Sequence, residues 1–506
     1  MRALINIVLA TFTFAVAGCA SMPEVSDRPY SERLDYNATT QLGGSLRALA
    51  QSHPGESGVV LLADPRDALI ARVQLARQAQ RTLDVQYYIW HGDLVGRHLI
   101  REIVQAADRG VRVRLLIDDL DGFSYAGQLA LLDQHDTISI RLFNPFNVRN
   151  RYALFRRGVD VLVNARRINH RMHNKTFTAD NQAAVVGGRN IGDEYFGLHS
   201  EHNFRDLDLL LAGPVVDDVS RSFDLFWNSE WAFPVDSLHA GATSVAELEA
   251  LLAELKSAPE PPIGSPIPEL VETWRQLIWC PAEVVYDPPE KLEDPTVGRR
   301  NRGALRAFLV QAQEELVVEN AYFVPGRDGV EAMAAMVERG VRLRVLTNSL
   351  AGNDSAMSHS GYAPYRRRLL NAGVELFELR PDAKVRDRHV LTDDDTRLGL
   401  HAKAILIDRR IVFIGTFNLD PRSVYLNTEI GVVLTCPMLA ERLHAEFAAD
   451  FAPESAWRVT LDDRRRLTWV GVTNGVVETH QQEPLASTGR RIAAWFWSLL
   501  PLESAL

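Results

Sequence analysis

The stretch HNKTFTADNQAAVVGGRN, which runs from His173 to Asn190, decides the fold because its pattern occurs twice. The second copy is HAKAILIDRRIVFIGTFN, from His401 to Asn418. Both copies read His-x-Lys-x4-Asp-x6-Gly-x-x-Asn, and no gap differs in length between them. A single His-x-Lys would fit an ordinary surface hairpin. Two complete copies in register indicate an internal duplication with a shared chemical role.

Each copy predicts a β-hairpin. The residues between His and Asp are apolar and β-branched enough for a strand, and side chains two apart on a strand share a face. A tight polar turn follows (ADNQ and DRR), and a second strand (AAVVGG and IVFIG) returns to the start of the first. It ends where glycine lets backbone come close and asparagine offers an amide donor. Each hairpin should therefore present one His, one Lys and one Asn at one edge.

Two imidazoles, two ammonium groups and two amides suit the chemistry of a phosphodiester. One His can act as the nucleophile and the other as the general acid, while the cations stabilise charge on the phosphoryl oxygens. This chemistry needs no metal, and the sequence predicts no cofactor.

The two motifs resemble the HKD motifs of the phospholipase D superfamily. Their flanks, GGRNIGDEYFG and GTFNLDPRSVYLNTEIG, are similar to those of bacterial cardiolipin synthases, especially the cardiolipin synthase C group. The resemblance runs from about residue 61 to the C-terminus. It implies an α/β phospholipase D-like fold with two homologous α/β/α halves around a pseudo-two-fold axis.

The resemblance also implies roles for individual residues, although the two histidines could exchange theirs. It makes His173 the nucleophile and His401 the general acid and base, assisted by Lys175 and Lys403. Asp206 and Glu429, each eight residues before a proline, would orient the imidazoles, as carboxylates next to histidines commonly do. The motif acids Asp180 and Asp408 would be structural, at the base of each hairpin. The remaining residues expected to contact the substrate or stabilise the transition state are Asn190, Asn418, Gly188 and Thr416.

The duplication extends beyond the motifs. The strand–helix–strand pattern of residues 83–120 returns in residues 314–350, with Gly110 and Gly340 at matching places. We therefore divide the chain into six segments: a lipoprotein signal peptide (1–18), a flexible tether (19–45), a first half (46–240), a Pro-rich linker (241–275), a second half (276–450) and a C-terminal extension (451–506).

The N-terminus predicts export and lipidation. Arg2 precedes an apolar run that is too short for a comfortable transmembrane helix and ends on Val-Ala-Gly-Cys at Cys19. This resembles a bacterial lipobox, and an ordinary secretory signal is the alternative. The resemblance implies a lipoprotein facing the periplasm, with Ala20 favouring the outer membrane. The other cysteines, Cys280 and Cys436, lie in apolar surroundings and are expected to be buried free thiols.

Charge and composition limit the classes of molecule that the protein is expected to bind. The net charge is −10 and the apolar content 46%, which favours packed cores and argues against a general nucleic-acid binder. Residues 149–175 nevertheless hold seven arginines, which fit either an approach for anionic lipid headgroups or a solvated surface. Near the C-terminus, Ile492, Trp495, Phe496, Leu499 and Leu500 share one helical face. Such a helix fits a membrane interface about as well as packing on the protein's own core.

The sequence therefore predicts a phosphatidyltransferase that forms cardiolipin from phosphatidylglycerol and a second phospholipid through a phosphohistidine. Its expected partners are phospholipids and a membrane, and the need for an accessory protein is open. A phospholipase D or phosphodiesterase that hydrolyses lipid, or less favourably nucleic acid, is the first alternative. A non-catalytic membrane lipoprotein is the second.

Overall fold

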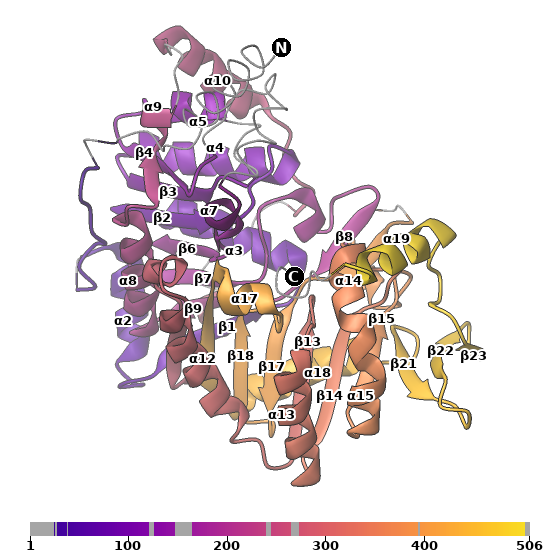
Figure 1. Cartoon of the computed structure of the whole chain (residues 1–506). Coiled ribbons are helices and arrows are strands. Elements are labelled where there is room, and N and C mark those ends of the chain that lie inside the picture. The colour runs from indigo at the N-terminus through magenta and orange to yellow at the C-terminus, as the bar shows by residue number, and fades with distance from the viewer. Residues whose placement is uncertain are drawn as a thin grey trace, which may run out of the picture.

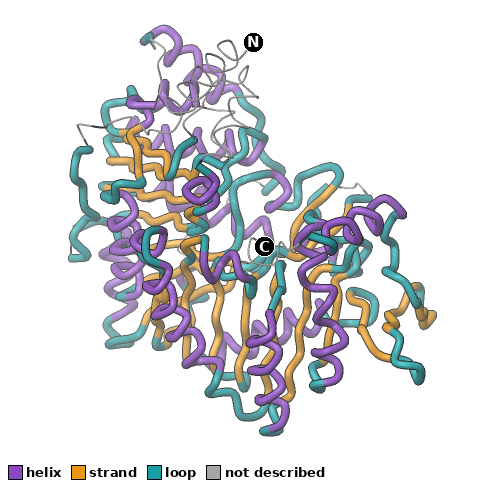
Figure 2. The backbone as a smooth tube through the Cα atoms, in the orientation of Figure 1, coloured by secondary structure: helices purple, strands orange, loops and turns teal. Residues whose placement is uncertain are grey.

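The computed structural model describes residues 25, 28–37, 39–120, 126–146, 164–238, 244–264, 273–392 and 395–500. Two large sheets, each flanked by helices, lie side by side in the molecule (Figures 1 and 2). The sequence prediction of an α/β protein with two similar halves is confirmed.

The first sheet has nine strands in the order β10-β4-β3-β2-β6-β7-β9-β1-β11. The strands are β1 (Ser57–Leu62), β2 (Thr82–Tyr87), β3 (Arg112–Asp118), β4 (Ile138–Phe143), β6 (Thr176–Ala179), β7 (Ala183–Gly187), β9 (Asp208–Ala212), β10 (Ala232–Pro234) and β11 (Ile278–Cys280). The helices of this half are α2 (Gln41–Ala50), α3 (Pro65–Gln78), α4 (Leu94–Asp108), α5 (Ala126–Leu132), α7 (Ala165–Asn169), η2 (Asp193–Tyr195), α8 (Val215–Trp227), α9 (Val235–Leu238) and α10 (Val245–Ser257).

The second sheet has ten strands in the order β12-β20-β18-β17-β13-β14-β15-β21-β22-β23. The strands are β12 (Ala282–Tyr286), β13 (Glu315–Asn320), β14 (Arg342–Asn348), β15 (Glu375–Leu379), β17 (Lys403–Ile407), β18 (Ile411–Gly415), β20 (Ile430–Thr435), β21 (Ala456–Leu461), β22 (Leu467–Thr473) and β23 (Val476–His480). The helices are η3 (Pro289–Leu292), α12 (Pro295–Leu309), α13 (Gly326–Glu338), α14 (Ala356–Tyr362), η4 (Ala363–Tyr365), α15 (Arg366–Asn371), α16 (Arg386–His389), α17 (Pro421–Tyr425), α18 (Pro437–Asp450) and α19 (Thr488–Ser498).

The two sheets share one strand order, which is the structural mark of the duplication. The order β10-β4-β3-β2-β6-β7-β9-β1 in the first sheet matches β21-β15-β14-β13-β17-β18-β20-β12 in the second. In each sheet three strands are parallel (β2-β3-β4 and β13-β14-β15), and the motif hairpin pairs antiparallel beside them. The histidine–lysine ends of the hairpins therefore lie at the edge where the parallel strands end.

The motif hairpins form as the sequence predicts. Strands β6 and β7 are joined by a turn with Asp180 and Asn181 at positive φ, and β17 and β18 by a turn with Asp408 and Arg409 at positive φ. Two consecutive residues of this conformation match the right-handed twist of the flanking strands. The turn geometry thus fixes the register of each hairpin, which in turn sets the positions of His and Lys.

The halves are joined by a shared apolar core. The cluster includes Val186 and Leu209 from the first sheet, Leu406 and Val432 from the second, and Leu443 from helix α18. Each half also has a separate core on the outer face of its sheet. The interface is therefore packed like a protein interior, and the groups that meet across it are held firmly.

The segments predicted as a linker and as a C-terminal extension both contain regular secondary structure. Within the segment assigned to a linker, α10 begins at a capping box formed by Ser244 and Glu247. Within the segment assigned to a C-terminal extension, β21 pairs with β15 and continues the second sheet. Cys280 and Cys436 are buried, as expected, and are free thiols. Across the described residues, we find no helix with the length and apolarity that crossing a bilayer requires.

Candidate active site

Two short parallel pairings between the halves assemble the site. Strand β5 (Arg171–Met172) pairs with β19 (Asn427–Thr428), and β8 (His202–Arg205) pairs with β16 (Arg397–Leu400). The His173 N–H donates to the Thr428 carbonyl at 2.9 Å, and the His401 N–H donates to the Arg205 carbonyl at 2.8 Å. Each motif histidine is thereby set beside the residue that follows its partner strand, Glu429 or Asp206.

The result is two histidine–carboxylate pairs, each of which crosses between the halves. His173 Nδ1 lies 2.7 Å from Glu429 Oε2, and His401 Nδ1 lies 2.6 Å from Asp206 Oδ2. The sequence predicted that Asp206 and Glu429 orient the imidazoles, but it did not say which acid serves which histidine. A carboxylate that accepts from Nδ1–H leaves Nε2 as the atom available to a substrate.

Both carboxylates are held in place by further hydrogen bonds. Glu429 Oε1 accepts from the Ser423 hydroxyl at 2.7 Å, and Asp206 Oδ1 accepts from the Leu207 N–H at 2.7 Å. A Cβ at Gly188 would lie 2.1 Å from Asp206 Oδ1, so this glycine gives Asp206 its space. The Thr416 hydroxyl, at the matching place in the second motif, bonds with both the N–H and the carbonyl of Ile430.

The surroundings of Gly188 and Thr416 favour a role other than the direct substrate contact expected from the sequence. Gly188 lies against Asp206, and Thr416 bonds to the residue that follows Glu429. Both positions therefore support the acids that orient the histidines.

The motif lysines are buried beside their own histidines. Lys175 Nζ donates to the His173 carbonyl at 2.8 Å, and Lys403 Nζ donates to the His401 carbonyl. Each ammonium also lies over a tyrosine ring, Lys175 at 5.3 Å from the Tyr88 centroid and Lys403 at 5.9 Å from that of Tyr322. Since each ammonium keeps donors to spare, both can serve an anion that enters the site.

Burial shapes the charges of these groups. It lowers the pKa of Lys175 to about 7 and that of Lys403 to about 8. Burial and the charge of Lys175 hold the pKa of His173 well below its usual value. The pKa of His401 is lowered by burial and Lys403, although Asp206 opposes the change. The site is thus a place where added negative charge is strongly favoured.

The motif aspartates bond to backbone at the turns of their hairpins. The Asp180 carboxylate accepts from the backbone N–H groups of Gln80, Arg81 and Thr82, at 2.8–3.2 Å. Asp408 does the same for Gln313, Glu314 and Glu315, at 2.8–2.9 Å. Each aspartate ties the turn of its hairpin to the segment that enters the neighbouring parallel strand.

The motif asparagines are buried at the ends of their hairpins. Asn190 Oδ1 accepts from the Ile89 N–H at 3.2 Å, and the Asn418 N–H donates to the Ser423 hydroxyl at 3.2 Å. Their expected part in binding phosphoryl oxygens remains a proposal.

Aromatic rings frame the histidines, and sequence reasoning did not single them out. Tyr88 meets His173 edge-on at a centroid distance of 4.8 Å. Around His401 lie Tyr195 at 5.1 Å, Phe204 at 5.2 Å and Tyr322 at 6.5 Å. The available signal was the pair of tyrosines in the repeated segments LDVQYYIW and ENAYFVP, which end at the catalytic edge. These rings pack against histidines that are themselves buried.

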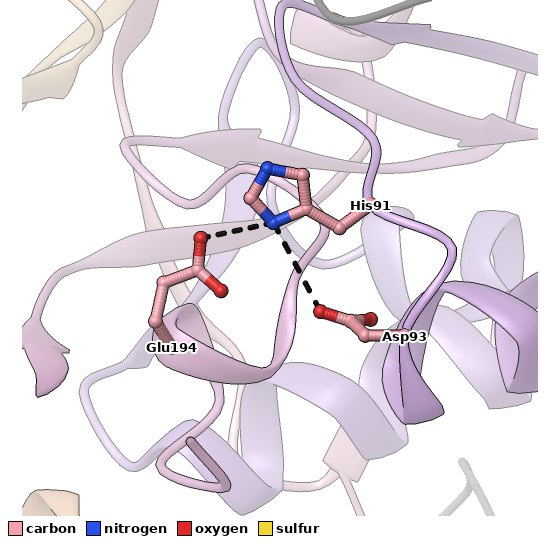
Figure 3. A group of neighbouring side chains, drawn as sticks. All are labelled: His91, Asp93 and Glu194. Atoms are coloured by element: carbon pink, nitrogen blue, oxygen red, sulfur yellow. Dashed lines mark ion pairs between the residues drawn. The ribbon is translucent and has the colours of Figure 1, made fainter. Parts of the chain in front are cut away.

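A separate group of His91, Asp93 and Glu194 has side chains of the types that bind metals (Figure 3). His91 Nδ1 lies 3.1 Å from Glu194 and 3.9 Å from Asp93. Asp93, however, caps α4 by accepting from the Gly96 N–H, and its other oxygen accepts from the Asp193 N–H. The positive end of a helix opposes a cation, so we assign Asp93 to capping and His91 to its contact with Glu194.

Part of the predicted basic stretch also has structural roles. Arg171 is buried against Asp118 at 3.2 Å, and Arg167 donates to Asn144 at 2.6 Å and to the Pro145 carbonyl at 2.8 Å. Arg166 is exposed on α7. The remaining arginines of this stretch (149, 151, 156 and 157), with Tyr152 and Phe155, lie in residues 147–163, outside the described residues, as does Cys19.

Comparison with known proteins assigns the chain to a family. The family model described as "Cardiolipin synthase, PLD-like domain" matches residues 73–227 and 305–451, one match in each half. The chain belongs to this family of the phospholipase D superfamily.

Individual relatives agree with this assignment. The chain is 38% identical over 486 residues to cardiolipin synthase C of Escherichia coli, covering 92% of this chain and 99% of the relative. It is 32% identical to an uncharacterized protein of Helicobacter pylori, with 92% of both chains covered. Among solved structures, phosphatidylserine synthase of Haemophilus influenzae matches with a TM-score of 0.53 at 13% identity, over 82% of this chain and 91% of that chain. At this identity the structural match supports the fold alone.

Proposed function

We propose that this protein is a phosphatidyltransferase that makes cardiolipin by joining phosphatidylglycerol to a second phospholipid, with phosphatidylethanolamine a candidate for the latter. The observation that carries the proposal is the pair of crossed histidine–carboxylate contacts, each with a buried lysine bonded to the carbonyl of its histidine. The similarity to cardiolipin synthase C over nearly the whole chain supports the choice of lipid.

The first half of the reaction breaks the donor phosphodiester. His173 Nε2 attacks phosphorus and forms an N–P bond, while the bond from phosphorus to the headgroup oxygen breaks. His401 donates its Nε2 proton to the departing alkoxide. Lys175, Lys403, Asn190 and Asn418 stabilise the negative charge that gathers on the phosphoryl oxygens.

The second half transfers the phosphatidyl group. His401 takes the proton from a hydroxyl of the acceptor lipid, whose oxygen attacks phosphorus and releases His173. Asp206 and Glu429 keep both imidazoles in the correct tautomer throughout. The burial of His173 and His401 and the surrounding rings favour a lipid alcohol over water as acceptor.

We also propose that the chain is a lipoprotein that faces the periplasm, with Cys19 as the lipidated residue and the outer membrane as the favoured location. The apolar run that ends at Cys19 supports this location. A membrane then becomes the source of both substrates.

The test is expression in a bacterial host that lacks its own cardiolipin synthases, followed by separation and quantification of total lipids. Cardiolipin should appear with the intact protein and vanish with His173→Ala. Phosphatidic acid without cardiolipin would identify a hydrolase and overturn the transferase proposal. If intact protein changed no lipid, even with a cell extract added as a source of accessory proteins, a non-catalytic lipoprotein would be the better description.

A further inference from the structure

Helix α19 (Thr488–Ser498) displays an apolar stripe to the outside. Ile492, Trp495, Phe496 and Leu499 follow the spacing i, i+3, i+4, i+7 and therefore lie on one face. They are 59%, 62%, 51% and 61% exposed. A helix of a soluble protein normally turns such a stripe toward the core. In this protein the stripe faces away from the core.

Contacts on the opposite face fix this orientation. Arg490 Nε donates to the Leu350 carbonyl at 3.0 Å, and Arg491 donates to the Glu483 carbonyl at 2.8 Å. Ala494 packs against a small cluster that contains Leu350 and Ala351. On this inner side Trp497 is also partly buried, whereas the four side chains of the stripe lie on the opposite side of the helix and are exposed.

The segment that holds α19 leads directly from the active site. Asn348, at the end of β14, exchanges two hydrogen bonds of 2.7 Å with Leu400, the residue before His401. In the loop after Asn348, the Asn353 carbonyl accepts a hydrogen bond from Arg490. In the same loop, Asp354 accepts from the hydroxyl of Tyr322, which borders His401. Figure 1 shows α19 beside α14, at the same end of the second sheet as α17.

We propose that the exposed stripe of α19 inserts into the boundary between headgroups and acyl chains of a phospholipid bilayer and so docks the catalytic edge onto its substrates. This inference rests on the proposed function, because a phospholipid substrate places the bilayer next to the site. Aromatic side chains are suited to this interface, where one side is apolar and the other is wet. At 11 residues the helix is too short to span a bilayer and fits a position parallel to its surface.

The test measures co-sedimentation of the full chain with vesicles of phosphatidylglycerol and phosphatidylethanolamine. All proteins carry Cys19→Ser, so that no acyl anchor can contribute to binding. Trp495→Glu with Phe496→Glu should lower vesicle partitioning on the order of tenfold or more. The matched control is Val245→Glu with Met438→Glu, which replaces two apolar residues that are 69% and 63% exposed elsewhere. The control should bind like the parent, and equal binding by all three proteins would overturn the proposal.

Two further measurements distinguish docking to lipid from damage to the active site and from self-association. On short-chain phospholipid dispersed in detergent, the double variant should turn over substrate at the parental rate, because the site is intact. If the parent itself failed on dispersed substrate but still bound vesicles, the proposed function would fail and the docking surface would stand. Sedimentation velocity without lipid should show the same oligomeric state for parent and variant. A parental dimer that the double variant dissociates would show that a second copy covers the stripe, and would overturn docking to lipid.

Discussion

At the scale of residues, the two histidine–carboxylate pairs share a geometry, but the pKa values of their carboxylates shift in opposite directions. Burial would raise the pKa of Asp206, but His401 and Lys403 overcome this effect and hold that pKa below its usual value. Burial raises the pKa of Glu429 instead. A firmly ionised Asp206 makes His401 easier to protonate than His173. This difference supports our proposal of His401 as the general acid and His173 as the nucleophile, which the symmetric motifs could not decide.

The lysines predict how activity depends on pH. In the proposed mechanism, phosphoryl binding needs both ammonium groups charged. In the free protein, burial lowers the pKa values of Lys175 and Lys403 to about 7 and about 8. Charge is lost as pH rises through these values, so kcat/KM should fall above about pH 7. The measurement is kcat/KM on dispersed phospholipid between about pH 6 and pH 9. Lys175→Arg serves as a control, because a position 175 that stays charged should move the start of the alkaline fall from about pH 7 toward the pKa of Lys403, about 8. A flat profile for the parent would contradict this account.

At the scale of elements, the sequence predicted the two motif hairpins but not the short strand pairings between the halves. The motif hairpins follow from apolar, β-branched residues on either side of the turns at Asp180 and Asp408, and the structure has both hairpins. The pairings of β5 with β19 and of β8 with β16 involve two to four residues each. Strands so short have no readable period, and their partners come from the other half. The sequence could therefore identify the acids but not assign each to its histidine.

The motif aspartates should affect folding more than chemistry. Asp408 binds three backbone N–H groups, and replacing it with alanine leaves these donors without their carboxylate. We expect Asp408→Ala to lower the free energy of unfolding by roughly 2–4 kcal/mol, measured by urea denaturation. The fraction that remains folded should keep most of the parental kcat. His401→Ala is the contrasting variant, with chemistry abolished while the three backbone contacts of Asp408 remain. An Asp408→Ala protein as stable as the parent but inactive would show instead that this acid takes part in the reaction.

At the scale of the whole molecule, neither half owns a complete catalytic pair. His173 depends on Glu429 from the second half, and His401 depends on Asp206 from the first. A protein with only one copy of the repeat could build the same two pairs by forming a symmetric dimer, in which each copy provides its acid to the histidine of the other. Fusion into one chain lets the two pairs diverge, and the contrast between aspartate and glutamate is such a divergence. The geometry of the active site consequently depends on how the two halves are positioned against each other.

A buried ion cluster at the interface tests that alignment. Arg205 of the first half lies 2.7 Å from Asp450 and 3.5 Å from Glu319 of the second, and its carbonyl accepts from the His401 N–H. Burial and the charge of Asp450 hold the pKa of Glu319 well above its usual value. In Asp450→Asn that charge is gone, so Glu319 should ionise and partly replace it.

We therefore expect Asp450→Asn and Glu319→Gln each to be tolerated, and the double variant to lose more stability than the sum of the two. With Arg205 left buried and unpaired, the double variant should lose about 3–5 kcal/mol in the free energy of unfolding. Glu375→Gln, at an ion pair with the largely exposed Arg342, is the control and should cost less than about 1 kcal/mol. While it is still folded, the double variant should also have a lower kcat than the parent. The reason is that a displaced Arg205 carbonyl no longer holds His401 against Asp206. Strictly additive losses would show that Glu319 does not substitute for Asp450, and that the interface does not adjust its charge in this way.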